Sequence, residues 1–170
     1  ANTGTKGRAG RSGKSVLMSG YILGLDPGNK FTGYCLVDAE LRPIRFGKES
    51  NGEVMDECVN IITSARFHPI TVVIERVASY GMAVGSEVFE TCEWIGRFAQ
   101  ELGHYAPIGY VYRRDEKKYI CGSPTANDAA IRRALADRFA YGEPNYGKGT
   151  KKEPGFFYGF KADIWSAFAV

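Results

Sequence analysis

The sequence predicts an α/β domain in which a five-stranded mixed sheet has helices on both faces. Short apolar, β-branched runs bounded by turn residues alternate with segments whose apolar residues recur at helical spacing. The first three apolar runs follow one another through tight turns, whereas the later ones are separated by helical segments. This order is typical of a sheet that combines an antiparallel meander with parallel strands. A chain of 170 residues can bury a proper core in one domain.

Five segments are predicted to be strands. They are residues 21–26, 31–38, 43–46, 70–75 and 107–112. The first ends at an acid and is followed by Pro27, Gly28 and Asn29, which supply turn chemistry. The fourth has the sequence ITVVIE, a β-branched run that is typical of a buried strand and that also ends at an acid.

Four segments are predicted to be helices. The inward faces of the first three consist of Val54, Cys58, Ile61 and Ala65; of Val88, Cys92, Ile95, Ala99 and Leu102; and of Ile131, Leu135 and Phe139. We expect Ser86 to cap the second helix, and Thr125 or Asn127 to open the third. The fourth covers residues 161–170, and residues 143–159 before it are predicted to be a long loop.

Residues 21–170 are expected to form this domain, and residues 1–20 a flexible basic arm or a cloning remnant. The first residues are rich in Gly, Ser, Thr and basic side chains and lack the hydrophobic stretch of a signal peptide. No apolar run approaches the length of a membrane helix. We therefore expect a cytoplasmic protein that does not contact a membrane.

Composition narrows the classes of site that the chain can hold. The formal net charge is only +3, so the overall balance does not indicate a nucleic-acid-binding protein, although Lys and Arg occur in clusters. The four cysteines lie far apart in apolar runs and are predicted to be reduced core thiols: Cys35, Cys58, Cys92 and Cys121. The two histidines lie near predicted helix ends, which argues against a Cys/His zinc site.

Three acids occupy positions that a stable fold would not choose. Asp26 and Glu75 end the first and fourth strands, and Asp163 lies in the first turn of the last helix. If those strands are neighbours, their carboxylates project from the same edge of the sheet. Each acid also has a structural explanation: Asp26 could start a turn, and Asp163 could match the helix dipole. Glu75 is harder to explain in this way, because it directly follows four apolar residues.

Clustered carboxylates stay ionised most easily around a cation. A set of oxygen ligands with no nearby histidine or thiolate favours Mg²⁺, with Mn²⁺ as a substitute. Two such ions about 3.5–4 Å apart would orient a water and stabilise both oxygens of a phosphodiester displacement. The prediction requires that the carboxyl groups of Asp26, Glu75 and Asp163 converge and are not paired off with arginines.

The sequence resembles the RuvC-type Holliday junction resolvases. Residues 22–38, ILGLDPGNKFTGYCLVD, are similar to the opening of that family, and VVIERVASYG to its second acidic strand. The stretch WIGRFAQ resembles the helix that follows, CGSPTANDAAIRRAL a Thr-Gly-x-Gly-x-Ala-x-Lys segment, and DIWSAFAV the C-terminal helix. The resemblance runs from about Tyr21 to the end of the chain and is greatest to phage-encoded members.

The resemblance implies an RNase H-like fold, a homodimer, and paired nicks across a four-way DNA junction. It matches Asp26, Glu75 and Asp163 to the family's metal-binding acids. The chain also departs from the pattern. Phe160 stands where the family has a fourth catalytic Asp or His, and Asp128, a candidate for that role, stands where the family often has Lys.

The predicted DNA contacts combine basic residues with one aromatic wedge. They are Tyr80, Arg113, Arg114, Lys117, Lys118, Arg132, Lys151 and Lys152. Tyr80 lies in the loop after Glu75, where the resemblance implies that a ring could hold bases unstacked. Phe156, Phe157 and Phe160, which follow Lys151 and Lys152 in the sequence, could stack on unpaired bases, but we favour a structural role in docking the last helix.

Three functions are compatible with these features. The leading hypothesis is a Mg²⁺-dependent endonuclease that resolves branched DNA such as Holliday junctions. A general RNase H-like nuclease acting on RNA–DNA hybrids or flaps would use the same fold and metal chemistry. A junction-binding module whose metal site has decayed is suggested by Phe160.

Overall fold

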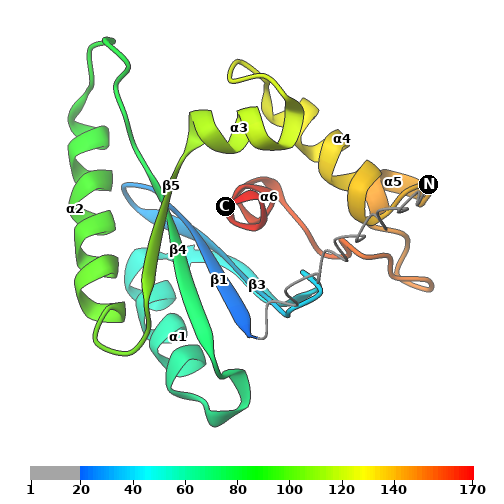
Figure 1. Cartoon of the computed structure of the whole chain (residues 1–170), viewed down its shortest axis with the longest axis horizontal. Helices are drawn as coiled ribbons and strands as arrows, with labels where there is room; N and C mark the ends of the chain where they lie inside the picture. The colour runs from blue at the N-terminus through cyan, green and yellow to red at the C-terminus, as the bar shows by residue number, and fades with distance from the viewer. Residues whose placement is uncertain (1–19) are drawn as a thin grey trace, which may run out of the picture.

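The computed structural model describes residues 20–170 and contains a five-stranded mixed sheet with helices on both faces (Figure 1). The strands are β1 (Tyr21–Pro27), β2 (Phe31–Val37), β3 (Pro43–Ser50), β4 (Ile70–Arg76) and β5 (Ile108–Tyr112). Their order in the sheet is β3-β2-β1-β4-β5. The predicted fold class is therefore confirmed, and the third strand is longer than predicted. The expectation for the N-terminal arm lies outside the described residues, except for Gly20.

The sheet is mixed in the way that the turn pattern predicted. β1 pairs antiparallel with β2, and β2 with β3, whereas β1 and β4 are parallel, as are β4 and β5. The central strands carry fully buried side chains at alternate positions, including Leu23, Leu25, Val72 and Ile74. Because β1, β4 and β5 run in the same direction, their carboxyl ends meet at one edge of the sheet.

Two helices cover one face of the sheet. They are α1 (Asn51–Thr63) and α2 (Ser86–Leu102), and a short 3-10 helix, η1 (Ala65–Phe67), follows α1. A capping box between Ser50 and Glu53 begins α1. The buried residues of α2 are Ile95, Phe98 and Leu102, all in its C-terminal half.

Two details of α2 differ from the sequence prediction. Gly85, not Ser86, is the N-cap residue, and it makes no side-chain capping bond. Cys92 is exposed because the N-terminal half of the helix buries no side chain. The prediction of core thiols holds for Cys35 and Cys58, whereas Cys121 is half-buried.

The other face is covered by α6 (Ala162–Ala169), with α3 (Arg113–Cys121) and α4 (Asp128–Phe139) arching over it (Figure 1). The short α5 (Pro144–Gly147) interrupts the predicted 143–159 loop. A cluster of aromatic side chains packs between α6 and the sheet, and Phe157, Phe160 and Trp165 are buried in it. The ring of Phe160 lies 4.8 Å from that of Phe46 and 5.2 Å from that of Trp165. The structural role predicted for these phenylalanines is confirmed.

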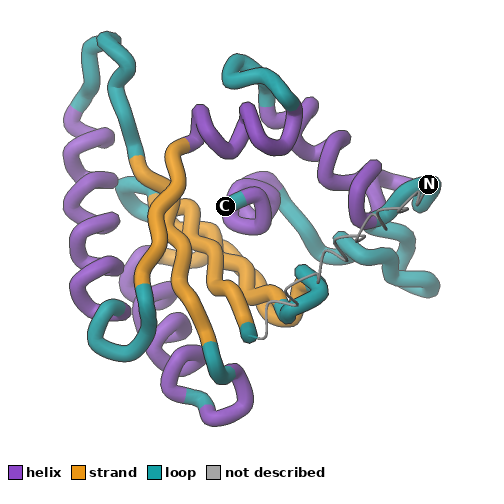
Figure 2. The backbone as a smooth tube through the Cα atoms, in the orientation of Figure 1, coloured by secondary structure: helices purple, strands orange, loops and turns teal. Residues whose placement is uncertain are grey.

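The sequence analysis did not predict α3. This helix follows β5 directly, is highly charged, and has Glu116 as its only buried residue. Figure 2 shows that the loop between β4 and α2 extends from the same edge of the sheet at which α3 begins. No helix among residues 20–170 is long and apolar enough to cross a membrane.

Candidate active site

Asp26 and Glu75 lie side by side at the carboxyl ends of two parallel strands. Leu25 of β1 is in register with Ile74 of β4, so each acid is the next residue on its strand. Side chains alternate between faces along a strand. Because Leu25 and Ile74 belong to the core under α1 and α2, both acids point to the opposite face, toward α6.

Asp163 joins this pair because α6 packs closely on the sheet over two glycines. A β-carbon at Gly24 would lie 2.2 Å from the carbonyl oxygen of Ala167, and one at Gly33 would lie 2.5 Å from that of Asp163. Gly33 is also the cross-strand partner of Asp26. The structure therefore brings the three predicted acids to one place, which we call the acidic edge.

Burial dominates the electrostatics of the two strand acids. It raises the pKa of Asp26 to about 6, although the charge of Arg113 opposes the shift and that of Asp163 adds to it. Burial also raises the pKa of Glu75 to about 8, with a further contribution from the charge of Asp26. At neutral pH the two carboxyl groups therefore hold about one proton between them when no metal ion is bound.

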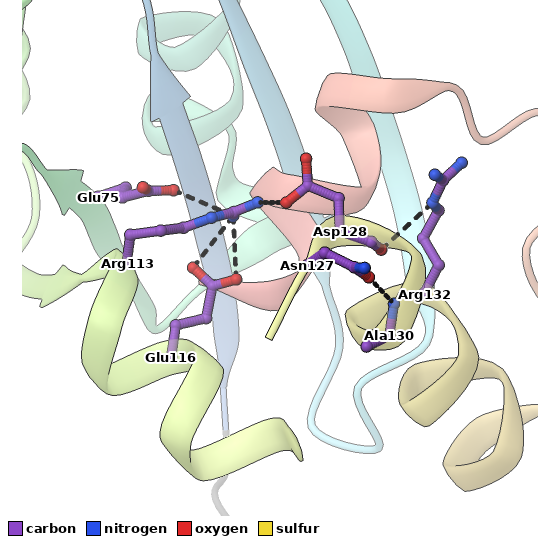
Figure 3. Close-up of polar contacts among 7 residues, drawn as sticks. All are labelled: Glu75, Arg113, Glu116, Asn127, Asp128, Ala130 and Arg132. Carbon is purple, nitrogen blue, oxygen red and sulfur yellow. Dashed lines mark hydrogen bonds and ion pairs between the residues drawn. The ribbon is translucent and has the colours of Figure 1, made fainter. Parts of the chain in front are cut away.

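Arg113, at the start of α3, lies among the acids (Figure 3). Its Nη1 is 3.0 Å from Oε1 of Glu116 and 3.5 Å from Oε2 of Glu75, and its Nη2 donates to Oδ1 of Asp128 across 2.8 Å. The Glu116 side chain is fully buried. Burial raises the pKa of Glu116 to about 7, and the adjacent Arg113 limits the rise.

A second cation, Lys48 of β3, pairs with Asp163. Its ammonium group also lies 5.6 Å from the centre of the Phe31 ring. The sequence analysis missed this residue, because an isolated Lys near a strand end carries no signal. Lys48 lies on β3, two strands away from β1, and it meets Asp163 because α6 lies across the sheet.

The acids offer the ligand chemistry of Mg²⁺ but are not arranged around one ion. Among residues 20–170, no three His, Cys, Asp or Glu side chains converge closely enough to hold a metal. Asp163 is engaged by Lys48, and Glu75 lies near Arg113. An oxygen-only set with raised carboxyl pKa values fits a hard divalent cation, provided that these two ion pairs open. The metal site therefore stays a prediction.

The predicted DNA-binding residues fall into separate groups. Tyr80, Arg114 and Lys118 line one groove of about 460 Å³ together with Tyr112, and the guanidinium of Arg114 lies 5.5 Å from the centre of the Tyr80 ring. Arg132 of α4 donates to the carbonyl oxygen of Asp128 across 3.3 Å.

The remaining predicted contacts are not all near this groove. Lys117 is half-buried on α3. Lys151 and Lys152 are exposed in the segment between α5 and α6, which Figure 1 places on the far side of α6 from the β4–α2 loop. Asp128, the candidate fourth polar residue, contacts Arg113, which lies among the acids.

No family profile and no curated protein sequence matches the chain. Solved structures do. The fold is similar to that of RuvC. The Thermus thermophilus RuvC structure matches with a TM-score of 0.55 and 14% identity, over 88% of this chain and 89% of that one. The structure of T. thermophilus RuvC in complex with a Holliday junction substrate matches equally well, with the same TM-score, identity and coverage. The likeness to RuvC establishes an RNase H-like fold for nearly the whole described chain.

Proposed function

We propose that this protein is a divalent-metal-dependent endonuclease that cuts branched DNA such as Holliday junctions. The placement of Asp26, Glu75 and Asp163 at one edge of an RNase H-like sheet is the observation that supports it most directly. Each acid comes from a different element, β1, β4 or α6. The segments that follow β4 and β5 at this edge contribute Tyr80 and Arg114 to the groove. The structural neighbour RuvC was solved with a Holliday junction.

The three acids would bind Mg²⁺, or Mn²⁺ in its place, with two ions in each site. The bound ions would supply a polarised water and stabilise negative charge on a phosphodiester. To bind them, the Asp26–Glu75 pair has to release its proton, and Asp163 has to leave Lys48. The hydroxyl of Ser166 contacts Asp26 and lowers its pKa, so it favours the ionised carboxylate and helps to orient it.

The groove beside the acidic edge suits distorted rather than regular DNA. An exposed aromatic ring next to Arg114 and Lys118 can stack on an unpaired base while the cations hold the flanking phosphates. A junction offers such bases at its crossover, whereas a linear duplex does not. This supports branched DNA as the substrate class.

Two active sites on one junction require a dimer, and α2 offers a surface for one. Phe89 is 62% exposed, Cys92 is exposed, and nothing lies within 4 Å of a β-carbon added at Gly96. These residues are spaced three to four apart, so they lie on the same outer face of the helix. We propose that α2 packs against its copy in a homodimer.

The cytoplasmic location and the phage origin stay predictions.

A cleavage assay tests the proposed nuclease. The full chain is incubated with a four-way junction, a Y-fork, an RNA–DNA hybrid or a linear duplex, with Mg²⁺, Mn²⁺ or a chelator. We expect cutting of the junction only with metal, and its loss in Asp26→Asn. Asp56→Asn makes the same change on the exposed surface of α1 and should cut as wild type does.

The alternatives give different patterns in the same assay. Preferential cutting of the hybrid would replace the proposal with a general RNase H-like nuclease. A second candidate, a junction-binding module without nuclease activity, is favoured by the ion pairs that Arg113 and Lys48 make with the acids. Tight junction binding with no cutting under either metal would establish it. Metal-dependent cutting that survives Asp26→Asn would exclude the acidic edge as the active site.

A further inference from the structure

We propose that Arg113 is a positioning residue that competes with the divalent ion for Glu75, while Glu116 and Asp128 hold its guanidinium at the acidic edge. The inference rests on the proposed function, since it assumes that Asp26, Glu75 and Asp163 bind the ion. The ion pairs give Arg113 a role beyond the DNA contact predicted from the sequence, and they add Glu116 to the site.

The three contacts of Arg113 are unequal. Its guanidinium lies 2.8 Å from Asp128 and 3.0 Å from the nearer oxygen of Glu116, but 3.5 Å from Glu75 (Figure 3). A contact of 3.5 Å is at the limit of a hydrogen bond, and the other two are strong charge-assisted bonds. An ion can therefore take Glu75 from Arg113 at little cost, and the other two bonds keep the guanidinium where it is.

The two anchors come from different parts of the chain. Glu116 lies one turn along α3 from Arg113, and Asp128 begins α4. The Glu116 side chain has no solvent exposure, so its charge has to be balanced inside the protein, and Arg113 is its partner. The Asp128 side chain is 70% exposed and is not needed for packing. A planar guanidinium fixed from two sides is well placed to present its remaining donors to a phosphate.

The arrangement gives Arg113 two successive roles. Without an ion, its positive charge partly neutralises Glu75 and Asp26, whose carboxylates would otherwise repel each other. With an ion on Glu75, the same charge remains beside the metal and weakens metal binding, but it is available to a DNA phosphate that approaches the acidic edge. Removing the charge should therefore tighten metal binding and impair cleavage, and a purely structural residue would not show this opposition.

Metal binding without DNA is the decisive measurement. Isothermal titration calorimetry with Mn²⁺ on the full chain should give a dissociation constant on the order of tenfold lower for Arg113→Gln than for wild type. The matched control is Arg114→Gln, which removes the same charge from the next residue of the same helix, where the side chain faces Tyr80. It should change the constant by less than about twofold. Arg113→Lys keeps the charge but not the two-pronged guanidinium, so its constant should lie closer to that of wild type than to that of Arg113→Gln.

The anchoring is tested at Asp128, because an exposed side chain can be changed without unfolding the protein. Asp128→Asn frees Arg113 to approach Glu75, so Mn²⁺ should bind several-fold more weakly. Asp115→Asn removes a charge from the exposed side of α3 and is the control. In an Arg113→Gln background the effect of Asp128→Asn should disappear, whereas simple loss of charge would act equally in both backgrounds.

The outcomes separate this inference from the proposed function. If wild type binds no Mn²⁺, or binds it equally after Asp26→Asn, the proposed metal site itself fails. If Asp26→Asn abolishes binding but Arg113→Gln and Arg114→Gln behave alike, the site stands and the role of Arg113 is overturned. Should Arg113→Gln not fold, equal effects of Asp128→Asn and Asp115→Asn would overturn it instead.

Discussion

Gly33 lies directly against the backbone of Asp163, and a β-carbon at Gly33 would come within 2.5 Å of the carbonyl oxygen of Asp163. The same glycine is paired with Asp26 across β1 and β2. One residue without a side chain thus sets the distance between an acid on the sheet and an acid on the helix above it. The closeness of α6 to the sheet, rather than the acids alone, defines the acidic edge.

We therefore expect Gly33→Ala to push α6 and Asp163 away from Asp26. The clash is with backbone, so it cannot be relieved by a side-chain rotation, and we expect a loss of about 1–3 kcal/mol in the free energy of unfolding. Metal-dependent cleavage should fall further than stability explains. Gly52→Ala is the control, because nothing lies within 4 Å of its added β-carbon. In helix α1 this change should stabilise the protein by about 0.5–1 kcal/mol. Denaturant unfolding and junction cleavage measure both effects.

Glu75→Gln should stabilise the metal-free protein at high pH. Burial raises the pKa of Glu75 from 4.5 to about 8, so the folded state holds a proton that the unfolded chain has already lost. Folding therefore becomes less favourable as the pH rises from about 4.5 to about 8. Gln imitates the protonated acid and removes this dependence. In chelator at about pH 8.5, we expect the melting temperature to rise by roughly 3 °C or more, with little change at about pH 5.

A control with the opposite sign accompanies this measurement. The Ser50 hydroxyl donates to Glu53 and lowers the pKa of that carboxyl, so the charged form of Glu53 is the stabilising one. Glu53→Gln should therefore lower the melting temperature slightly at high pH. If Glu75→Gln also lowers it there, the buried carboxyl is not held protonated in the folded state.

The parts of the site that follow from strand order were predictable from the sequence. Asp26 and Glu75 stand out because each ends an apolar strand, and a parallel arrangement of those strands brings them together. Asp163 is a weaker signal on its own, because an acid in the first turn of a helix also suits the helix dipole. Phe160 could not be judged from sequence, because its role depends on rings from β3 and α6 that surround it in the core.

The cations of the site were not predictable in the same way. Helix α3 has no apolar periodicity, since Glu116 is its only buried residue. The one signal for its end was Gly122, which adopts the left-handed conformation that commonly terminates helices. The contacts of Arg113 with Asp128 and of Lys48 with Asp163 join residues that are far apart in sequence, and no local pattern records them.

Tyr80→Ala should reduce the rate of junction cleavage by about tenfold, because a ring that stacks on one unpaired base contributes on that scale. Tyr80 is half exposed in the β4–α2 loop, at a positive φ of 47°, and holds its ring near Arg114. Tyr80→Phe keeps the ring and should retain most activity, and Tyr141→Ala removes a more exposed ring at the end of α4 as a control. Fluorescence of 2-aminopurine at the crossover would report unstacking. Unchanged cleavage and fluorescence in Tyr80→Ala would remove it as a wedge.

Phe89→Glu should convert the proposed homodimer into a folded monomer. A charge on the outer face of α2 would be buried without a partner if two copies of the helix pack there, whereas in a monomer it is simply solvated. Sedimentation equilibrium should show the change in mass, and thermal melting should show that the fold persists. Tyr119→Glu introduces the same charge at a 79% exposed ring on α3 and should leave the dimer intact.

Cys92 gives an independent measure of the same contact. Because it lies one helical turn from Phe89, mild oxidation should join two copies through this thiol when α2 helices are packed together, and Phe89→Glu should prevent the cross-link. The half-buried Cys121 on α3 serves as the internal control and should remain reduced. Paired nicking of a junction should become single nicking in Phe89→Glu, since each cut then needs a separate encounter. A wild-type protein that sediments as a monomer on junction DNA and still cuts both strands together would refute the dimer.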